Sequence, residues 1–151
     1  MPFNHLRSGV KTILANDNES PELRMTKLCE LLQMSIGYYD WVGFYFANHE
    51  TQTLHLKAFA GEPTDHVEIP FGKGICGQVA VSNNNFIVAD VKTQNNYIAC
   101  SIHVKAEIVV PLFKDGVNIG QIDVDSHTAD PFSSEDEKFL EFVCERLAKI
   151  I

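Results

Sequence analysis

Two β-rich segments, residues 107–113 and 117–124, constrain the fold of this chain more than any other feature of its sequence. Between them stands Lys114-Asp115-Gly116, and an Asp-Gly step flanked by such segments is typical of a β-hairpin, because glycine tolerates a positive φ. A second pair of β-rich segments, residues 41–46 and 54–59, is separated by a polar turn and predicts another hairpin. We therefore expect an antiparallel sheet that needs a layer of helices to cover its apolar side.

Segments with helical spacing lie on either side of these hairpins. Apolar residues recur every three or four positions between residues 3 and 14, and Ser20-Pro21-Glu22 then combines an N-cap, a proline at N1 and an early acid. The helix that this motif begins is expected to end at Gly37. Ser134-Glu135-Asp136-Glu137 predicts a capping box for a last helix, whose apolar stripe runs over residues 139–150. This order of elements indicates the α+β class, with helices on one or both faces of the sheet.

The bulk properties fit one domain over residues 1–151, since neither a linker nor a repeat interrupts the sequence. The chain has 20 acidic and 12 basic residues, and its net charge of −8 disfavours nucleic acid and anionic membranes as partners. It does not exclude a zwitterionic metabolite.

The N-terminus has no apolar leader, and the longest apolar stretch, residues 108–113, is far shorter than the ~18 residues that span a bilayer. We expect a cytoplasmic protein with reduced thiols.

Residues 72–77 contain the pattern G-x-G-x-x-G, which is also found in dinucleotide-binding folds. Those folds need a parallel strand and an acid ~20 residues further on, whereas Asp90 follows the last glycine by only 13 residues. We expect a tight loop into a helix, with short strands before and after it at residues 67–69 and 86–89. The loop places Cys76 near a helix N-terminus, where the helix dipole is expected to lower the pKa of its thiol.

The segment Ile122-Asp123-Val124-Asp125 alternates apolar and acidic residues. In a strand, this alternation places Asp123 and Asp125 on one face and the apolar residues on the other. On an exposed face the two carboxylates are simply solvated. If the face lines a cavity, two like charges raise each other's pKa and can retain a proton at neutral pH. The spacing leaves both interpretations open.

The four cysteines differ in their surroundings. Cys29 and Cys144 lie in amphipathic helical segments, where a thiol usually acts as a small buried apolar group. Cys100 follows a polar loop and lies near His103 and Lys105, whose positive charge favours a thiolate. A loop cysteine of this kind is either inert or catalytic. The cysteines form no C-x-x-C pair and the six histidines show no ligand spacing, so neither a metal site nor a cofactor is predicted.

Five motifs, in this order, resemble those of the GAF-domain free methionine-(R)-sulfoxide reductases, and the resemblance covers nearly the whole chain. They are Trp41-Val42-Gly43-Phe44-Tyr45, Gly74-Ile75-Cys76-Gly77, Tyr97-Ile98-Ala99-Cys100, Ala106-Glu107-Ile108-Val109-Val110-Pro111-Leu112 and Ile122-Asp123-Val124-Asp125-Ser126. The resemblance implies a GAF fold, with a central antiparallel sheet of about six strands and N- and C-terminal helices packed against it. It further implies a ligand cavity on the other side of the sheet and a homodimer that packs through terminal helices.

The same resemblance implies an activity, the thiol-dependent reduction of free L-methionine-(R)-sulfoxide. Cys100 takes the position of the catalytic cysteine, whose thiolate attacks the sulfoxide sulfur while an acid protonates the departing oxygen. Methionine leaves and Cys100 becomes a sulfenic acid. A second thiol then forms a disulfide with it, which a thioredoxin-type partner reduces.

The resemblance also implies a substrate site. Trp41 and Tyr45 fall where the family cradles the sulfoxide and the side chain of the amino acid. Glu107, Asp123 and Asp125 fall where it places acids that hold the ammonium group and assist proton transfer, with Asp125 as a catalytic acid.

One position departs from the family pattern. The family often has a further cysteine ten residues before the Gly-Ile-Cys-Gly cysteine, where it resolves the sulfenic acid, and this chain has His66 there. Recycling then depends either on Cys76 as a second catalytic thiol or on an external thiol that acts on Cys100 directly. The alternative is a non-catalytic GAF module that binds a small molecule or signals, because a fold does not fix a function.

Overall fold

The computed structural model describes residues 3–94 and 103–151. In this part of the chain the elements follow the order expected from the sequence. Their bounds are α1 Asn4–Leu14, α2 Pro21–Ser35, β1 Trp41–Asn48, β2 Thr53–Ala60, β3 Glu68–Pro70, α3 Gly74–Ser82, β4 Phe86–Val88, a 3₁₀ turn Val91–Thr93, β5 Ala106–Lys114, β6 Val117–Ser126 and α4 Ser134–Ala148. Among these helices, none has the length and apolar character that a bilayer span requires.

The described strands form one six-stranded sheet in the order β3-β2-β1-β6-β5-β4. Every neighbouring pair is antiparallel, which confirms the predicted sheet and the α+β class. The β5–β6 turn has positive φ at both Asp115 and Gly116, 53° and 78°, as the sequence predicts for an Asp-Gly hairpin. The two central strands, β1 and β6, come from opposite halves of the chain, so their side chains meet only in the folded sheet.

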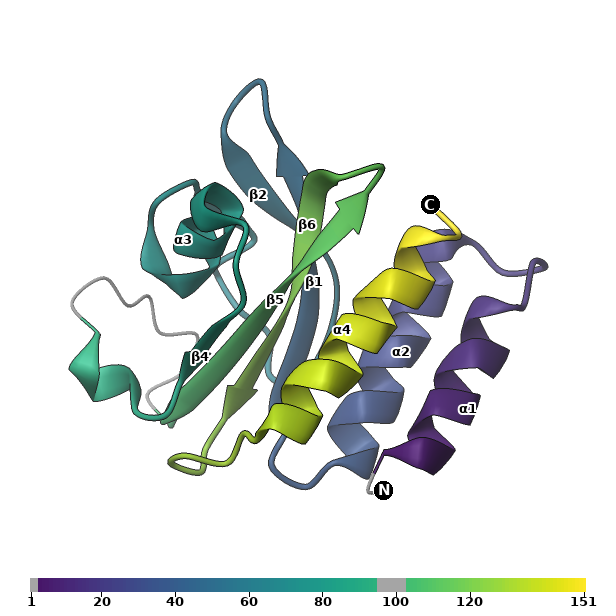
Figure 1. Cartoon of the computed structure of the whole chain (residues 1–151), viewed down its shortest axis with the longest axis horizontal. Coiled ribbons are helices and arrows are strands. Elements are labelled where there is room, and N and C mark those ends of the chain that lie inside the picture. Colours follow the sequence, from purple (N-terminus) through teal and green to yellow (C-terminus); the bar gives the residue numbers. More distant parts are fainter. Residues whose placement is uncertain (1–2, 95–102) are drawn as a thin grey trace.

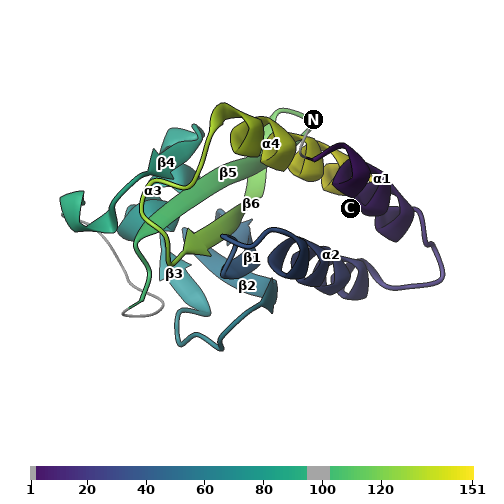
Figure 2. The same ribbon diagram turned by 90° about the horizontal axis from the view of Figure 1, so that it is seen from below.

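The sheet separates two cores of different size. Helices α1, α2 and α4 cover one face, and α3 lies on the other (Figures 1 and 2). The larger core fills the helix-covered side and is centred on Phe44, Ile108, Ile122 and Phe139, all fully buried. The smaller core lies under α3. We refer to the two sides as the helix face and the α3 face.

Capping side chains fix where the helices begin. Ser20 accepts a hydrogen bond from the backbone N–H of Leu23 at 3.1 Å, as the predicted N-cap of α2 should. The capping box of α4 begins one residue earlier than the sequence suggested. Ser133, not Ser134, is the N-cap, and its backbone N–H donates to Asp136 at 2.9 Å. The buried Asp136 carboxylate also accepts a hydrogen bond from the Tyr39 hydroxyl at 2.8 Å, and this contact fixes which acid of the segment serves as the cap.

Candidate active site

The register of the three central strands brings the candidate acids together. Asp125 on β6 lies directly between Trp41 on β1 and Glu107 on β5, and Asp123 pairs with Gly43 on β1 in the next row of the α3 face. Asp123 and Asp125 are each 1% exposed. The two aspartates are therefore buried rather than solvated, which decides between the two interpretations that their spacing leaves open.

The glycine-rich segment before α3 lets this helix approach the acids closely. A Cβ atom on Gly77 would lie 2.6 Å from the carbonyl oxygen of Pro70, so only glycine fits there. The backbone N–H of Gly72 donates to the carbonyl of Gly77 at 2.8 Å and closes the loop. The segment is thus a tight loop into a helix between antiparallel strands, as predicted, and it places Cys76 in the first turn of α3.

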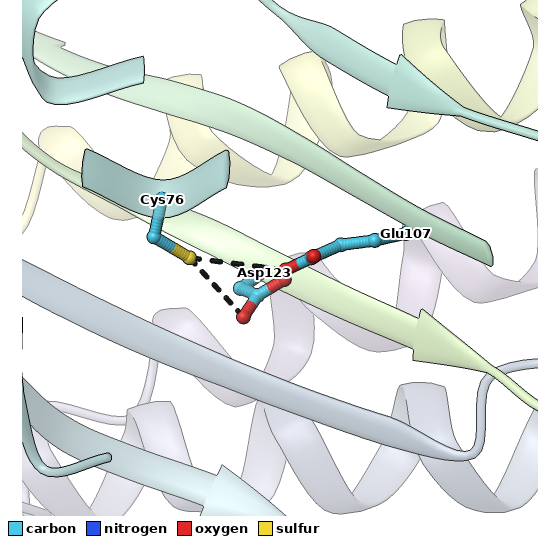
Figure 3. Close-up of side chains that lie close together, drawn as sticks. All are labelled: Cys76, Glu107 and Asp123. Atoms are coloured by element: carbon cyan, nitrogen blue, oxygen red, sulfur yellow. Dashed lines mark hydrogen bonds between the residues drawn. The ribbon is translucent and has the colours of Figure 1, made fainter. Parts of the chain in front are cut away.

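Cys76, Glu107 and Asp123 form one buried cluster, which we call the thiol–acid cluster. The Cys76 Sγ lies 3.3 Å from Oδ2 of Asp123 and 3.9 Å from Oε2 of Glu107 (Figure 3). Glu107 and Asp123 are also close to each other, since one carboxylate oxygen of each lies within 4.8 Å of the other and of the sulfur. Burial of two adjacent carboxyl groups favours a proton on one of them, because neither charge is well solvated.

The electrostatics of the cluster overturn one expectation from the sequence. The position near a helix N-terminus suggested a lowered pKa for Cys76, but burial, followed by the charges of Asp123 and Glu107, raises the pKa of this thiol well above its usual value. Burial also raises the pKa of Asp123, while hydrogen bonds from Glu107 and Cys76 oppose the rise. The direction for Asp123 agrees with the prediction, but its main cause is desolvation rather than the charge of the neighbouring aspartate.

Aromatic side chains form a wall beside the cluster. The Trp41 indole lies over Gly43, where a Cβ atom would meet the ring at 2.3 Å, and it stacks on Phe59 with centroids 5.9 Å apart. The Trp41 Nε1–H donates to the carbonyl of Glu62 at 3.0 Å. The Tyr45 ring is fully buried, and its hydroxyl donates to the backbone carbonyl of His66 at 2.8 Å. Both predicted aromatic residues therefore lie on the α3 face next to the acids.

A small cavity connects the cluster to the surface. Its enclosed free space is about 10 Å³, which is room for roughly one water molecule. It is lined by Tyr45, His66, Ile69, Lys73, Gly74, Ile75, Cys76, Glu107 and Asp123. The acids are buried at its floor, whereas the Lys73 side chain is exposed and His66 is half-buried. The cavity thus has negative groups at one end and basic side chains at the other.

Two basic residues that line the cavity, His66 and Lys73, were not among the predicted site residues. In the sequence, His66 was singled out only because it replaces a cysteine of the family pattern, and Lys73 was not singled out. The signal for Lys73 was available, because it stands between Gly72 and Gly74 at the beginning of the loop that carries Cys76. A third polar side chain, Gln121, continues the alternation of Asp123 and Asp125 along β6 and is fully buried on the same face.

The remaining cysteines divide into two groups. Cys29 and Cys144 are buried in helices, which confirms their prediction as small apolar groups, and burial raises the pKa of Cys144 to about 12. Cys100 lies outside the described residues, and so does the predicted Cys76–Cys100 linkage.

Comparisons with known proteins agree with this architecture. The GAF domain family profile matches residues 22–151. GAF domain-containing protein A of Dictyostelium discoideum is 41% identical over 91% of this chain and 85% of its own length. The free methionine-R-sulfoxide reductase of Escherichia coli is 32% identical over 99% of this chain and 84% of its own.

Solved structures give the same result. The free methionine-R-sulfoxide reductase of Neisseria meningitidis, determined in complex with its substrate, has a TM-score of 0.91 at 31% identity and covers 98% of this chain and 87% of its own. Fold, family profile and full-length similarity therefore agree. The chain belongs to the GAF-domain free methionine-R-sulfoxide reductase family, whose members are oxidoreductases.

Proposed function

We propose that this protein reduces free L-methionine-(R)-sulfoxide to methionine. The observation that carries the proposal is the thiol–acid cluster, buried beside an aromatic wall in a fold that closely matches a reductase determined with its substrate. A protonated carboxyl group next to an aromatic surface offers what the reduction of a sulfoxide requires, a proton donor and an apolar contact for the methyl sulfoxide.

The charge distribution of the cavity supports a free amino acid as the substrate. Glu107 and Asp123 line the cavity, and with Asp125 buried beside them they provide negative charge for an ammonium group, which a peptide-bonded nitrogen lacks. At the other end, Lys73 and His66 are suited to the α-carboxylate. Trp41 and Tyr45 then hold the side chain between the two charged ends. Because the enclosed space is only about 10 Å³, binding has to displace lining side chains, and the exposed Lys73 is the freest of them.

The proposed first step uses Cys100 as the nucleophile. Its thiolate attacks the sulfoxide sulfur, and the protonated member of the Glu107–Asp123 pair, or Asp125 beside it, donates a proton to the sulfoxide oxygen. The S–O bond breaks and the hydroxyl group passes to Cys100, which becomes a sulfenic acid. The sulfoxide gains two electrons and the cysteine loses two, so no external reductant enters this step.

The proposed second step uses Cys76. Its raised pKa keeps this thiol protonated at neutral pH, so it needs a base, and the Asp123 carboxylate 3.3 Å away is placed to accept its proton. Attack of the Cys76 thiolate on the Cys100 sulfenic acid forms a disulfide, and the accepted proton leaves with the hydroxyl group as water. A thioredoxin-type dithiol then reduces the disulfide. An external thiol acting directly on Cys100 is the other route.

The alternative function is a GAF module that binds a small molecule without turnover. The protonated state of Cys76 favours this alternative, because a protonated thiol is a poor nucleophile. Consumption of NADPH with thioredoxin and its reductase distinguishes the two. The proposal predicts turnover with the free R epimer and little with the S epimer or with N-acetylmethionine sulfoxide. Equal rates with the acetylated compound would contradict the role of the acids, and no turnover with any sulfoxide would favour the binding module.

A further inference from the structure

We propose that the thiol–acid cluster is also a binding site for Zn²⁺, and that Zn²⁺ bound there excludes the substrate. The sequence alone predicts no metal site here, because the three ligands come from α3, β5 and β6 and no local spacing reveals them. In the structure, one ligand atom from each of Cys76, Glu107 and Asp123 lies within 4.8 Å of the other two. All three side chains are buried.

The distances match a tetrahedral zinc site. Zinc binds thiolate sulfur at about 2.3 Å and carboxylate oxygen at about 2.0 Å, and a tetrahedral angle then separates sulfur and oxygen by about 3.5 Å. The two observed sulfur–oxygen distances, 3.3 Å to Asp123 and 3.9 Å to Glu107, lie on either side of this value. Small side-chain adjustments are enough to place all three atoms around one ion.

A buried oxygen of Asp123 also points to a ligand at this cluster. The second carboxylate oxygen of Asp123, Oδ1, is buried and has no hydrogen-bond partner among the described residues. A buried oxygen in this state is costly, and a cation bound through the other oxygen of the same carboxylate, Oδ2, offsets part of that cost. The cavity beside the cluster has about 10 Å³ of free space, enough for a water molecule as the fourth ligand.

The donor atoms select for zinc over the common hard cations. Mg²⁺ and Ca²⁺ prefer six or more oxygen ligands, whereas one thiolate and two carboxylates suit a borderline-soft, four-coordinate ion.

Zinc in this position occupies the place proposed for the substrate ammonium group and holds Cys76 as a bound thiolate. Inhibition competitive with the free sulfoxide is therefore expected. Metal binding itself does not depend on the proposed function and is tested without turnover, whereas the exclusion of the substrate rests on that function.

The direct test uses Co²⁺ as a spectroscopic probe for the zinc site, in a Cys100→Ser background so that no signal comes from Cys100. We expect one Co²⁺ per chain, with thiolate-to-cobalt charge-transfer absorption and the d–d bands of tetrahedral cobalt, and we expect Zn²⁺ to displace it. Adding Cys76→Ser should abolish the charge-transfer absorption. Adding Cys144→Ser should preserve it, because this buried thiol lies outside the cluster and serine keeps its hydrogen bond to the Val110 carbonyl.

Two acid variants complete the test. Glu107→Gln and Asp123→Asn should each weaken Co²⁺ binding at least about tenfold, since even partners outside the coordination shell cost that much. Charge-transfer absorption that is absent from the Cys100→Ser protein, or that survives Cys76→Ser, would overturn the proposal. If Cys76→Ser fails to fold by circular dichroism, the acid variants decide, and unchanged cobalt affinity in both would overturn it.

Discussion

The two faces of the sheet are built from the same strands but differ in what they bury. On β5, Ile108 points into the helix face and Glu107 into the α3 face, and on β6, Val124 and Asp123 divide in the same way. The helix face is an apolar core under three helices. The α3 face buries acids, an amide and a thiol under one short helix. Alternation along a strand thus lets neighbouring residues serve stability and chemistry separately.

The two faces of the sheet also differ in how much they contribute to stability. Burying an apolar side chain stabilises the fold by about 1.5–3 kcal/mol, whereas a buried polar atom without a partner costs about 1–3 kcal/mol. Within the described residues, both polar side-chain atoms of Gln121 and one oxygen of Asp123 are buried without a hydrogen-bond partner on the α3 face. On the helix face the same holds for one nitrogen, Nε of Arg24. The α3 face is therefore expected to contribute less to stability than the helix face. Substitutions on the helix face should mainly lower stability, whereas substitutions on the α3 face should mainly lower activity.

The largest expected effect concerns the helix face. Phe139 is fully buried and stacks on Phe3 with ring centroids 4.8 Å apart. Phe139→Ala should lower the free energy of unfolding by about 3–5 kcal/mol because it leaves a cavity in the main core. Urea denaturation measures the loss, and sulfoxide reduction per folded molecule should stay near wild type. A large loss of activity in the folded fraction would show that the two faces are not separate.

The next prediction compares substitutions of two adjacent residues on β5. Glu107→Gln should lower kcat/KM for the free sulfoxide by about 100-fold, since the cluster loses an acid proposed to bind the ammonium group and transfer a proton. Ile108→Val, one position along, should leave kcat/KM unchanged and lower the free energy of unfolding by about 1 kcal/mol. Steady-state kinetics and urea denaturation of both variants give the answer. Similar losses of kcat/KM in the two variants would show that the face to which a β5 side chain points does not decide its role in activity.

A smaller effect is expected at the open end of the cavity. Lys73→Gln should lower kcat/KM about tenfold for free methionine sulfoxide because it removes a charge-assisted contact of ~1.5 kcal/mol with the α-carboxylate. Methionine sulfoxide amide lacks that carboxylate, so its kcat/KM should change little. Lys57→Gln, another exposed lysine outside this cavity, is the matched control. Equal losses with both substrates would remove Lys73 from carboxylate recognition.

The smallest effect should be a gain in stability. Gln121→Leu replaces a buried amide without partners among the described residues by an apolar side chain of similar volume, and it should raise the free energy of unfolding by about 1 kcal/mol. Thermal and urea unfolding measure the change. A loss of more than about 1 kcal/mol would indicate that the Gln121 amide makes hydrogen bonds in the folded protein that leucine cannot replace.

Local patterns in the sequence were sufficient for most of the fold. The Asp115-Gly116 turn, the Ser20 cap and the alternation around Asp123 depend on neighbours in the chain, so each could be identified from the sequence. The exact cap of α4 could not, because the buried contact between Asp136 and Tyr39 joins residues 97 positions apart.

The electrostatics of the site could not be predicted in the same way. The sequence places Cys76 near a helix N-terminus, which alone lowers the pKa of a thiol. It does not show that β5 and β6 bring Glu107 and Asp123 against the sulfur in a buried space, and these contacts reverse the direction. The charge at the open end of the cavity was likewise missed, since Lys73 becomes a lining residue only when the loop before α3 folds over the sheet.

If the α3 face is the site of sulfoxide reduction, reduced protein should form methionine in a single turnover. Reduced protein is mixed with free L-methionine-(R)-sulfoxide without any reductant, and methionine is quantified after rapid quenching. We expect about one methionine per chain for wild type and for Cys76→Ser, a much slower burst for Asp123→Asn, and none for Cys100→Ser. An unchanged burst in Asp123→Asn would leave Glu107 or Asp125 as the proton donor, whereas sulfoxide that binds to the wild-type protein without forming methionine would overturn the proposed function.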